Sequence, residues 1–199
     1  MIDIESRVAI TDNLSRFGRL EAEHALKPAA VAIVLLRYGD ALCVPIFQRP
    51  SSMRMHASQM ALPGGKLHAG ETAEAGAIRE LGEELGLDVG RGDVLGALDD
   101  FNTKSGYTIT PIVVWSDTSV KSLRPSIAEV GWLLPIGLDE LREAAAASSG
   151  DNSPKFSLKL ASVEVFAPTA AILYQFSEVA LEGRSSRVAD FYQPPFTHR

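Results

Sequence analysis

The apolar positions of the chain change repeatedly between strand-like runs and helix-like spacing. Continuous apolar runs at 29–36 and 41–47, separated by the turn residues Tyr38–Asp40, predict two strands, the first of them buried on both faces. Apolar residues at helical spacing predict a helix from Thr72 to Leu85. Similar patterns predict strands at 93–101, 107–115, 129–134 and 162–166, and helices at 138–147 and from Pro168 to Leu181. This order of elements predicts an α/β fold.

The two ends of the chain have weaker patterns. Scattered apolar positions among charges predict an amphipathic helix over 2–26, broken near Thr11–Asn13. The methionine-containing stretch 49–60 and the soft segment 148–154 are predicted loops, and no repeat or convincing linker divides the chain. We therefore expect one domain over 1–199, with a helical extension at 1–27 and an irregular tail at 183–199.

Composition limits the classes of function. The net charge of −6 argues against an extended basic surface for nucleic acid, so an anionic substrate would be bound locally. No apolar run approaches the roughly 20 residues of a membrane span, and acids stand where a signal peptide would carry basic residues. The single cysteine, Cys43, lies among apolar residues and is expected to be a buried thiol rather than a reactive one. These features favour a cytoplasmic protein.

An unusual density of acids lies in the sequence RELGEELG, residues 79–86. At about 100° per residue, Glu80, Glu83 and Glu84 share one arc of roughly 100° on the predicted helix. Like charges at this spacing repel, and Gly82 weakens the helix further, with close packing as its expected purpose. A run of glutamates is usually only a solvated face. Carboxylates gathered with little cationic relief also suit a hard divalent cation such as Mg²⁺.

The residues around this helix fit a longer signature, G-x5-E-x7-R-E-U-x-E-E-x-G-U, in which U is a bulky aliphatic residue. The segment resembles the Nudix hydrolases, enzymes that cleave a nucleoside diphosphate linked to another moiety. The resemblance implies an α/β/α sandwich with a mixed central sheet and a loop–helix–loop that binds Mg²⁺ or Mn²⁺. The matching positions are Gly65, Glu71, Arg79, Glu80, Leu81, Glu83, Glu84, Gly86 and Leu87.

The resemblance also implies roles for individual residues. The expected cation ligands are Glu80, Glu83 and Glu84, with the carbonyl of Gly64 as a further ligand. Bound cations would polarise the diphosphate and activate the attacking water. Glu83 or Glu80 is the expected general base, and Glu129 is an alternative on another loop.

The remaining signature positions are expected to support the acidic face. Arg79 would orient the acids and pair with Glu71 or Glu80. Glu71 would brace the loop, and Gly65 and Gly86 are expected to be structural.

Substrate class is predicted from the segment that precedes the signature. Arg49, Arg54 and the sequence Pro63–Gly65 resemble the accessory motif of the coenzyme A pyrophosphatase branch, R-[SA]-x3-R-x3-G-x3-F-P-G-G. This resemblance implies cleavage of coenzyme A or an acyl derivative into 3′,5′-ADP and phosphopantetheine. Arginines suit the additional phosphate of such a substrate, although one of them could instead pair with an acid of the helix. The expected substrate-binding residues are Arg49, Arg54, His56, Gln59 and Lys66.

Three departures from that accessory motif leave other functions open. Pro50, Ser58 and Leu62 stand where the branch has a small residue, glycine and phenylalanine. A pyrophosphatase of the same chemistry acting on ADP-ribose, a dinucleotide or a nucleoside triphosphate is the first alternative. A non-catalytic binding module is the second. The apolar N-terminal helix could also serve a homodimer contact.

Overall fold

One large sheet lies between α-helices. The computed structural model describes residues 2–22, 27–50, 59–148, 156–160 and 163–191. The helices of these regions are α1 (Ile2–Arg16), α2 (Ala73–Leu85), α3 (Leu138–Ser148) and α4 (Thr169–Phe176), which continues as a π-helical segment over Ser177–Leu181.

The large sheet is mixed. Its long strands are β1 (Lys27–Tyr38), β2 (Ala41–Gln48) and β7 (Tyr107–Ser119), and its order is β3-β2-β1-β7-β5. Strands β1 and β7 run parallel, whereas the other pairs are antiparallel. The shorter strands are β3 (Met60–Ala61), β4 (Gly64–Lys66), β5 (Val94–Ala97), β6 (Phe101–Asn102) and β8 (Trp132–Gly137), and a separate hairpin joins β9 (Ser157–Leu160) to β10 (Val163–Phe166).

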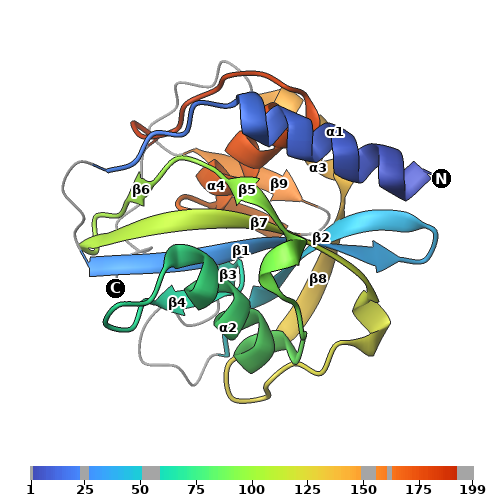
Figure 1. Ribbon diagram of the computed structural model, residues 1–199, viewed down its shortest axis with the longest axis vertical. Coiled ribbons are helices and arrows are strands. Elements are labelled where there is room, and N and C mark those ends of the chain that lie inside the picture. Colours follow the sequence, from blue (N-terminus) through green and yellow to red (C-terminus); the bar gives the residue numbers. More distant parts are fainter. Residues whose placement is uncertain (1, 23–26, 51–58, 149–155, 161–162, 192–199) are drawn as a thin grey trace.

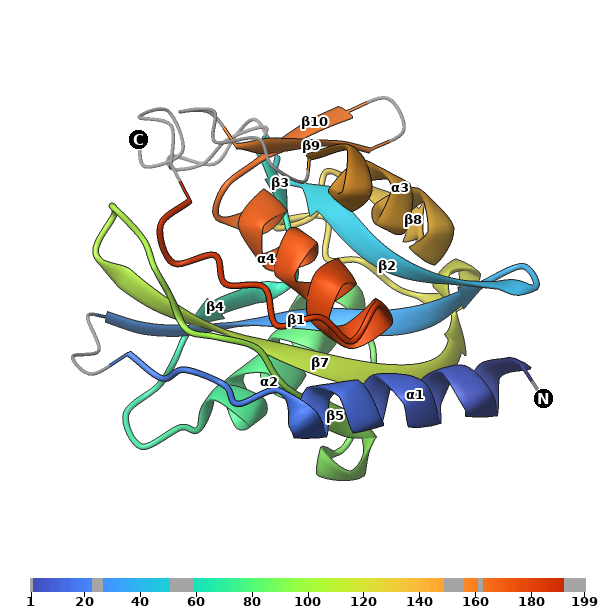
Figure 2. The ribbon, with the colours of Figure 1, turned by 90° about the horizontal axis from the view of Figure 1, so that it is seen from above.

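Helices cover both faces of this sheet (Figure 1). Ile33 and Leu35 of β1 belong to the apolar core that includes residues of α1, α3 and α4. Val34 and Leu36 alternate with them and belong to a second core that includes buried residues of α2. Seen from above, α4 crosses the sheet between α1 and α3 (Figure 2). The predicted α/β/α sandwich with a mixed sheet is confirmed, as is the burial of β1 on both faces.

The N-terminal helix differs from the prediction at two points. Helix α1 continues without a break through Thr11–Asn13, and the Thr11 hydroxyl donates a hydrogen bond to the Arg7 carbonyl one turn earlier. The helix ends at Arg16 rather than near residue 26. Beyond it the backbone bonds to two aspartates instead: the N–H of Leu20 donates to Asp99 and that of Ala22 to Asp100.

The same aspartates explain a second difference. The strand predicted at 93–101 is divided into β5 and β6, because the backbone N–H groups of Asp99 and Asp100 donate to the Gln175 side chain and to the Leu20 carbonyl instead of to β7. Strand β8 begins at Trp132 rather than at 129, since residues 126–130 form a turn in which the N–H of Val130 donates to the Ser126 carbonyl. The short strands β3, β4 and β9 were not predicted.

The structure also bears on the predictions for the cysteine, the C-terminal tail and a membrane span. Cys43 is buried, and burial raises the pKa of its thiol to about 11. Residues 183–191 form neither helix nor strand, as predicted for the described part of the tail. No helix in the described regions is long and apolar enough to cross a bilayer. The single-domain organisation and the homodimer contact stay predictions; α1 exposes Ile4 and Val8.

Candidate active site

Helix α2 is bounded by a cap at each end. The Thr72 hydroxyl accepts a hydrogen bond from the N–H of Ala75, which satisfies a free donor of the first turn. Gly86 ends the helix in the left-handed conformation with φ of 62°, and the N–H of Leu87 donates to the Leu81 carbonyl. A Cβ atom on Gly86 would lie 2.9 Å from the Arg124 carbonyl oxygen. These features confirm the predicted helix and explain why position 86 requires glycine.

Arg79 binds three of the acids around the helix. Its guanidinium donates to both carboxylate oxygens of Glu71, at 2.9 and 3.1 Å, and one amino group also donates to Glu80 at 2.8 Å and Glu83 at 2.9 Å. A further bond reaches the Lys66 carbonyl. The hydrogen bonds from Arg79 and from the His68 N–H lower the pKa of Glu71 to about 2, and Glu71 raises the pKa of Arg79 in turn. Arg79 thus contacts both of its expected partners.

Glu84 is the buried member of the acidic face. Its side chain is only 3% exposed, and one carboxylate oxygen accepts a hydrogen bond of 2.9 Å from the N–H of Gly64. Burial raises the pKa of Glu84 to about 8, against the lowering effects of the Gly64 bond and the Arg49 charge; the nearby charges of Glu80 and Glu129 raise it further. Without a cation, Glu84 is therefore mainly protonated at neutral pH.

Two glycines let the backbone of β4 approach its neighbours closely. A Cβ atom on Gly65 would lie 2.2 Å from a carboxylate oxygen of Glu80. A Cβ atom on Gly64 would lie 2.3 Å from the Ala30 carbonyl oxygen and 2.7 Å from the Val31 Cα. Gly64 therefore packs against the β1 backbone, and Gly65 makes room for an acid of the site.

Glu129 approaches the acidic face from a separate turn. The N–H of Ser126 donates to the Glu84 carbonyl, and the N–H of Gly131 donates to the Gln48 carbonyl. These bonds fix the turn between the end of α2 and strand β2. Glu129 is half-buried and close enough for its charge to raise the Glu84 pKa. The structure thus brings Glu129 to the same site.

The donors of this site suit a hard divalent cation. Across the described regions, no three His, Cys, Asp or Glu side chains already converge as a cation site, and Arg79 bonds to Glu80 and Glu83. Carboxylate oxygens nevertheless approach from α2 and from the turn that carries Glu129. Ionised Glu84 is buried beside other carboxylates, so a cation would supply the positive charge that its ionised form needs. On this test, the residues fit Mg²⁺ or Mn²⁺.

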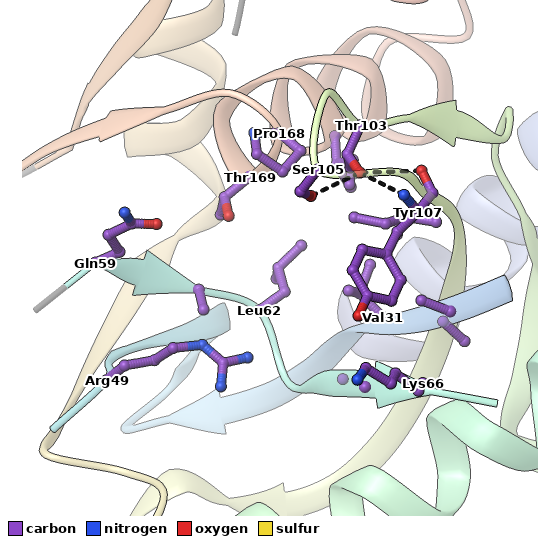
Figure 3. Close-up of a pocket in the computed structure, with 17 residues that line it drawn as sticks. Val31, Arg49, Gln59, Leu62, Lys66, Thr103, Ser105, Tyr107, Pro168 and Thr169 are labelled. Carbon is purple, nitrogen blue, oxygen red and sulfur yellow. Dashed lines mark hydrogen bonds between the residues drawn. The ribbon is translucent and has the colours of Figure 1, made fainter. Parts of the chain in front are cut away.

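A pocket opens on the other side of β4 (Figure 3). The described residues enclose about 360 Å³ there, and the lining includes both Gly64 and Gly65. Arg49 and Gln59 lie on one side of the pocket, and Lys66 and Tyr107 lie on the other. Three of the expected substrate-binding residues therefore line one cavity. Arg54 and His56 lie outside the described residues.

Comparison with known proteins decides the family. The sequence profile described as the NUDIX domain matches residues 26–154. The chain belongs to this family. It is 32% identical over 120 residues to the uncharacterized Nudix hydrolase NudL of Klebsiella aerogenes, an alignment covering 55% of this chain and 95% of that protein. It is 31% identical over 119 residues to NudL of Escherichia fergusonii, covering 54% of this chain and 59% of that protein.

A solved structure supports the Nudix fold. A MutT/nudix family protein from Enterococcus faecalis superposes with a TM-score of 0.54 and 16% identity, covering 81% of this chain and 64% of that protein. At this identity the likeness concerns the fold alone. The prediction of a Nudix hydrolase is confirmed at the level of the family, whereas the particular substrate stays a prediction.

Part of this Nudix pocket was not predicted from the sequence. Its upper wall comes from the turn after β6 and from the start of α4, elements far from the signature. Thr103 fixes that turn, since its hydroxyl accepts a hydrogen bond from the N–H of Tyr107 and contacts Ser105. The sequence SGYTIT offered a signal, because a polar turn leads there into a strand. The unpredicted lining residues include Thr103, Ser105, Tyr107, Pro168, Thr169 and Ile172.

Proposed function

We propose that the protein hydrolyses a nucleoside diphosphate linkage with a divalent cation, and that its substrate is coenzyme A or an acyl derivative. One observation carries the proposal: Gly64 and Gly65 line the pocket while also contacting the acidic face of α2. A nucleoside in the pocket would therefore have its diphosphate beside the acids. The products would be 3′,5′-ADP and phosphopantetheine, or acyl-phosphopantetheine.

Different residues of the chain would bind the cation and position the acids in this reaction. Glu80, Glu83, Glu84 and the Gly64 carbonyl would hold Mg²⁺ or Mn²⁺, which supplies charge neutralisation and an activated water when bound. Arg79 holds Glu80 and Glu83 on one amino group and so keeps their spacing fixed. The four bonds it donates to carboxylates also prevent these acids from dispersing.

Accessibility distinguishes the candidate general bases. The Glu83 side chain is 54% exposed, whereas that of Glu80 is 13% exposed. Glu84 carries a proton at neutral pH without a cation, because burial raises its pKa to about 8. A base must accept a proton from an incoming water, so we favour Glu83 and keep Glu80 and Glu129 as alternatives.

The pocket supports a nucleotide substrate with few polar contacts. Its walls combine apolar side chains such as Val31 and Ile172 with Arg49, Gln59 and Lys66 around the rim. Concave apolar sites with a few placed polar groups are typical of ligand pockets, and about 360 Å³ lies near the lower end of their usual volumes. The size favours one nucleoside, with the rest of the substrate extending outside.

A second substrate class follows from Leu62. This residue lines the pocket where the coenzyme A branch has phenylalanine, and it is 3% exposed. Loss of an aromatic surface there favours the alternative that the enzyme accepts ADP-ribose, a dinucleotide or a nucleoside triphosphate. The diphosphate chemistry would be the same.

A substrate panel tests the proposal. Purified protein with Mn²⁺ or Mg²⁺ would be given coenzyme A, an acyl derivative, ADP-ribose, a dinucleotide and a nucleoside triphosphate, and the products would be separated by chromatography. We expect the highest kcat/KM for coenzyme A or its acyl derivative, with 3′,5′-ADP as product. A higher kcat/KM for ADP-ribose, the dinucleotide or the nucleoside triphosphate would reject coenzyme A as the preferred substrate and support the second substrate class. No turnover of any compound with either cation contradicts both.

A further inference from the structure

Two lysines converge on one aromatic ring at the rim of the pocket. The ammonium nitrogen of Lys66 lies 5.5 Å from the centre of the Tyr107 ring, and that of Lys27 lies 5.7 Å from it. Ammonium groups at this distance are attracted by the electron-rich face of a ring. Tyr107 therefore holds two positive charges beside the pocket that it lines.

The strand registers bring these three side chains to the same face of the sheet. Lys27 of β1 is the partner of Tyr107 of β7, and Ala29 of β1 is the partner of Lys66 of β4. Partners on neighbouring strands point to one face, and residues two apart in a strand, such as Lys27 and Ala29, share it. Ala29, Lys66 and Tyr107 all line the pocket, so this is the pocket face.

The charges of Lys27 and Lys66 have no acidic partner among the residues that the structure describes. Two ammonium groups beside one ring, without a paired carboxylate among the described residues, attract an anion to this edge of the pocket. The arrangement therefore favours an anionic ligand over a purely structural contact.

Arg49, a further cation in the described lining of the pocket, has a different neighbour. Arg49 lies on the opposite side of the pocket from Lys66 and Tyr107 (Figure 3), and its charge lowers the pKa of buried Glu84. Arg49 thus belongs to the side where the acidic face and the diphosphate would meet. A second phosphate on the nucleoside would need a separate cationic group, and the two lysines provide one.

We infer that Lys27, Lys66 and Tyr107 form a subsite for a phosphate monoester carried by the substrate's nucleoside. The inference rests on the proposed function in that it assigns the same pocket to the nucleotide. In this subsite, Lys27 and Lys66 would distinguish coenzyme A from its dephosphorylated form. Lys66 also connects the two parts of the site, because its carbonyl accepts a hydrogen bond from Arg79.

Equilibrium binding tests the subsite without requiring turnover. Calorimetry would compare 3′,5′-ADP with 5′-AMP, which lacks the second phosphate, for the wild type and for Lys27→Gln, Lys66→Gln and the double variant. We expect wild type to prefer 3′,5′-ADP, each single variant to reduce that preference about threefold, and the double variant about tenfold. Lys159→Gln is the matched control, since Lys159 is exposed on β9 outside the pocket, and it should leave the preference unchanged.

Two further comparisons separate a ligand contact from a structural role. Tyr107→Phe keeps the ring and should retain the preference, whereas Tyr107→Leu should reduce it. The preference should also fall with added salt, because Lys27 and Lys66 are exposed. Equal affinity of wild type for the two nucleotides, or a preference unaffected in the double variant, would overturn the inference.

The same variants give a kinetic readout. Coenzyme A and dephospho-coenzyme A would be compared by kcat/KM, and the double variant should lose the preference for coenzyme A that this ratio measures. A binding preference without turnover of either compound would support the subsite and count against the proposed function. Turnover of both at a ratio that the lysine variants leave unchanged would reject the subsite and retain the hydrolase.

Discussion

The Arg79 guanidinium donates two hydrogen bonds to the Glu71 carboxylate, from Nε at 2.9 Å and from a terminal nitrogen at 3.1 Å. Glu71 also accepts the N–H of His68, so this pair ties the loop before α2 to the helix itself. The second amino group of Arg79 remains available for Glu80 and Glu83. One arginine therefore fixes the loop and the acids together.

Arg79→Lys tests whether the hydrogen-bond geometry of Arg79, and not only its positive charge, is needed to hold the loop and the acids. Lysine keeps the positive charge but cannot form the paired bonds to Glu71 while also reaching two other acids. We expect a loss of about 1–3 kcal/mol in the free energy of unfolding, measured with urea, and a fall in kcat of at least about tenfold. Arg91→Lys, an exposed arginine beyond the helix, is the control. Equal stability and kcat in both variants would refute the role given to Arg79.

Glu84 makes the cation-free protein less stable as pH rises. Its folded pKa of about 8 exceeds its ordinary value of 4.5, so the folded state keeps a proton that the unfolded state has lost. Stability from this group is complete below pH 4.5 and is lost as pH rises to about 8, on the order of 5 kcal/mol in total.

Glu84→Gln isolates this contribution. In chelator, urea unfolding at pH 5, 6.5 and 8 should show the variant gaining stability relative to wild type as pH rises. Cation affinity of wild type should rise over the same range, because binding requires the ionised carboxylate. Glu74→Gln, an exposed glutamate of the same helix, should show no comparable trend. A stability difference for Glu84→Gln that does not vary with pH would contradict the burial argument.

Gly64 and Gly65 should respond differently to alanine. In Gly64→Ala the new Cβ meets the β1 backbone at 2.3 Å, which cannot move aside, so we expect a loss of about 3 kcal/mol or more. In Gly65→Ala the three atoms nearest to the new Cβ all belong to the Glu80 carboxyl group, the nearest at 2.2 Å, and a side-chain end can shift more easily than backbone. That variant should stay within about 1 kcal/mol of wild type but lose about 100-fold in kcat as the acid is displaced. Thermal unfolding and steady-state kinetics check the pair, and the reverse order would be incompatible with the geometry.

The two interior glycines of α2 should also differ. Gly82 is exposed, and a Cβ there would meet only the Leu87 carbonyl at 3.9 Å, so the expected close packing is wrong for this position. A Cβ on Gly76 would lie 2.3 Å from a Leu67 methyl carbon, so close packing applies there instead. Gly82→Ala should stabilise the protein by up to about 1 kcal/mol, and Gly76→Ala should destabilise it by about as much. Equal effects in urea unfolding would disprove the assignment.

The helix of the site could be predicted because its signals are local. Thr72 and Gly86 provide caps within a few residues of the helix, and the acidic arc follows from 3.6 residues per turn. The burial of Glu84 could not be predicted in this way, since it depends on β4 and on a turn more than 40 residues later. Its partner Gly64 lies 20 residues earlier in the chain.

The misplaced boundaries have the same origin. The predicted strand at 93–101 divides because the backbone N–H groups of Asp99 and Asp100 donate to Gln175 and to Leu20, both distant in the chain. The pocket wall from Thr103 to Tyr107 and the start of α4 likewise meet only in the folded chain. The local propensity of a segment does not depend on the distant residues that it contacts in the fold, so tertiary contacts override it.

Release of 3′,5′-ADP from coenzyme A is the most direct test of the hydrolytic site. Wild type with Mn²⁺, wild type in chelator, Glu83→Gln and Glu74→Gln would be compared at equal concentration of folded protein. We predict release by wild type and Glu74→Gln with the cation, none in chelator, and a loss of at least about 100-fold in Glu83→Gln. Undiminished release by Glu83→Gln, or no release by wild type, would contradict the account.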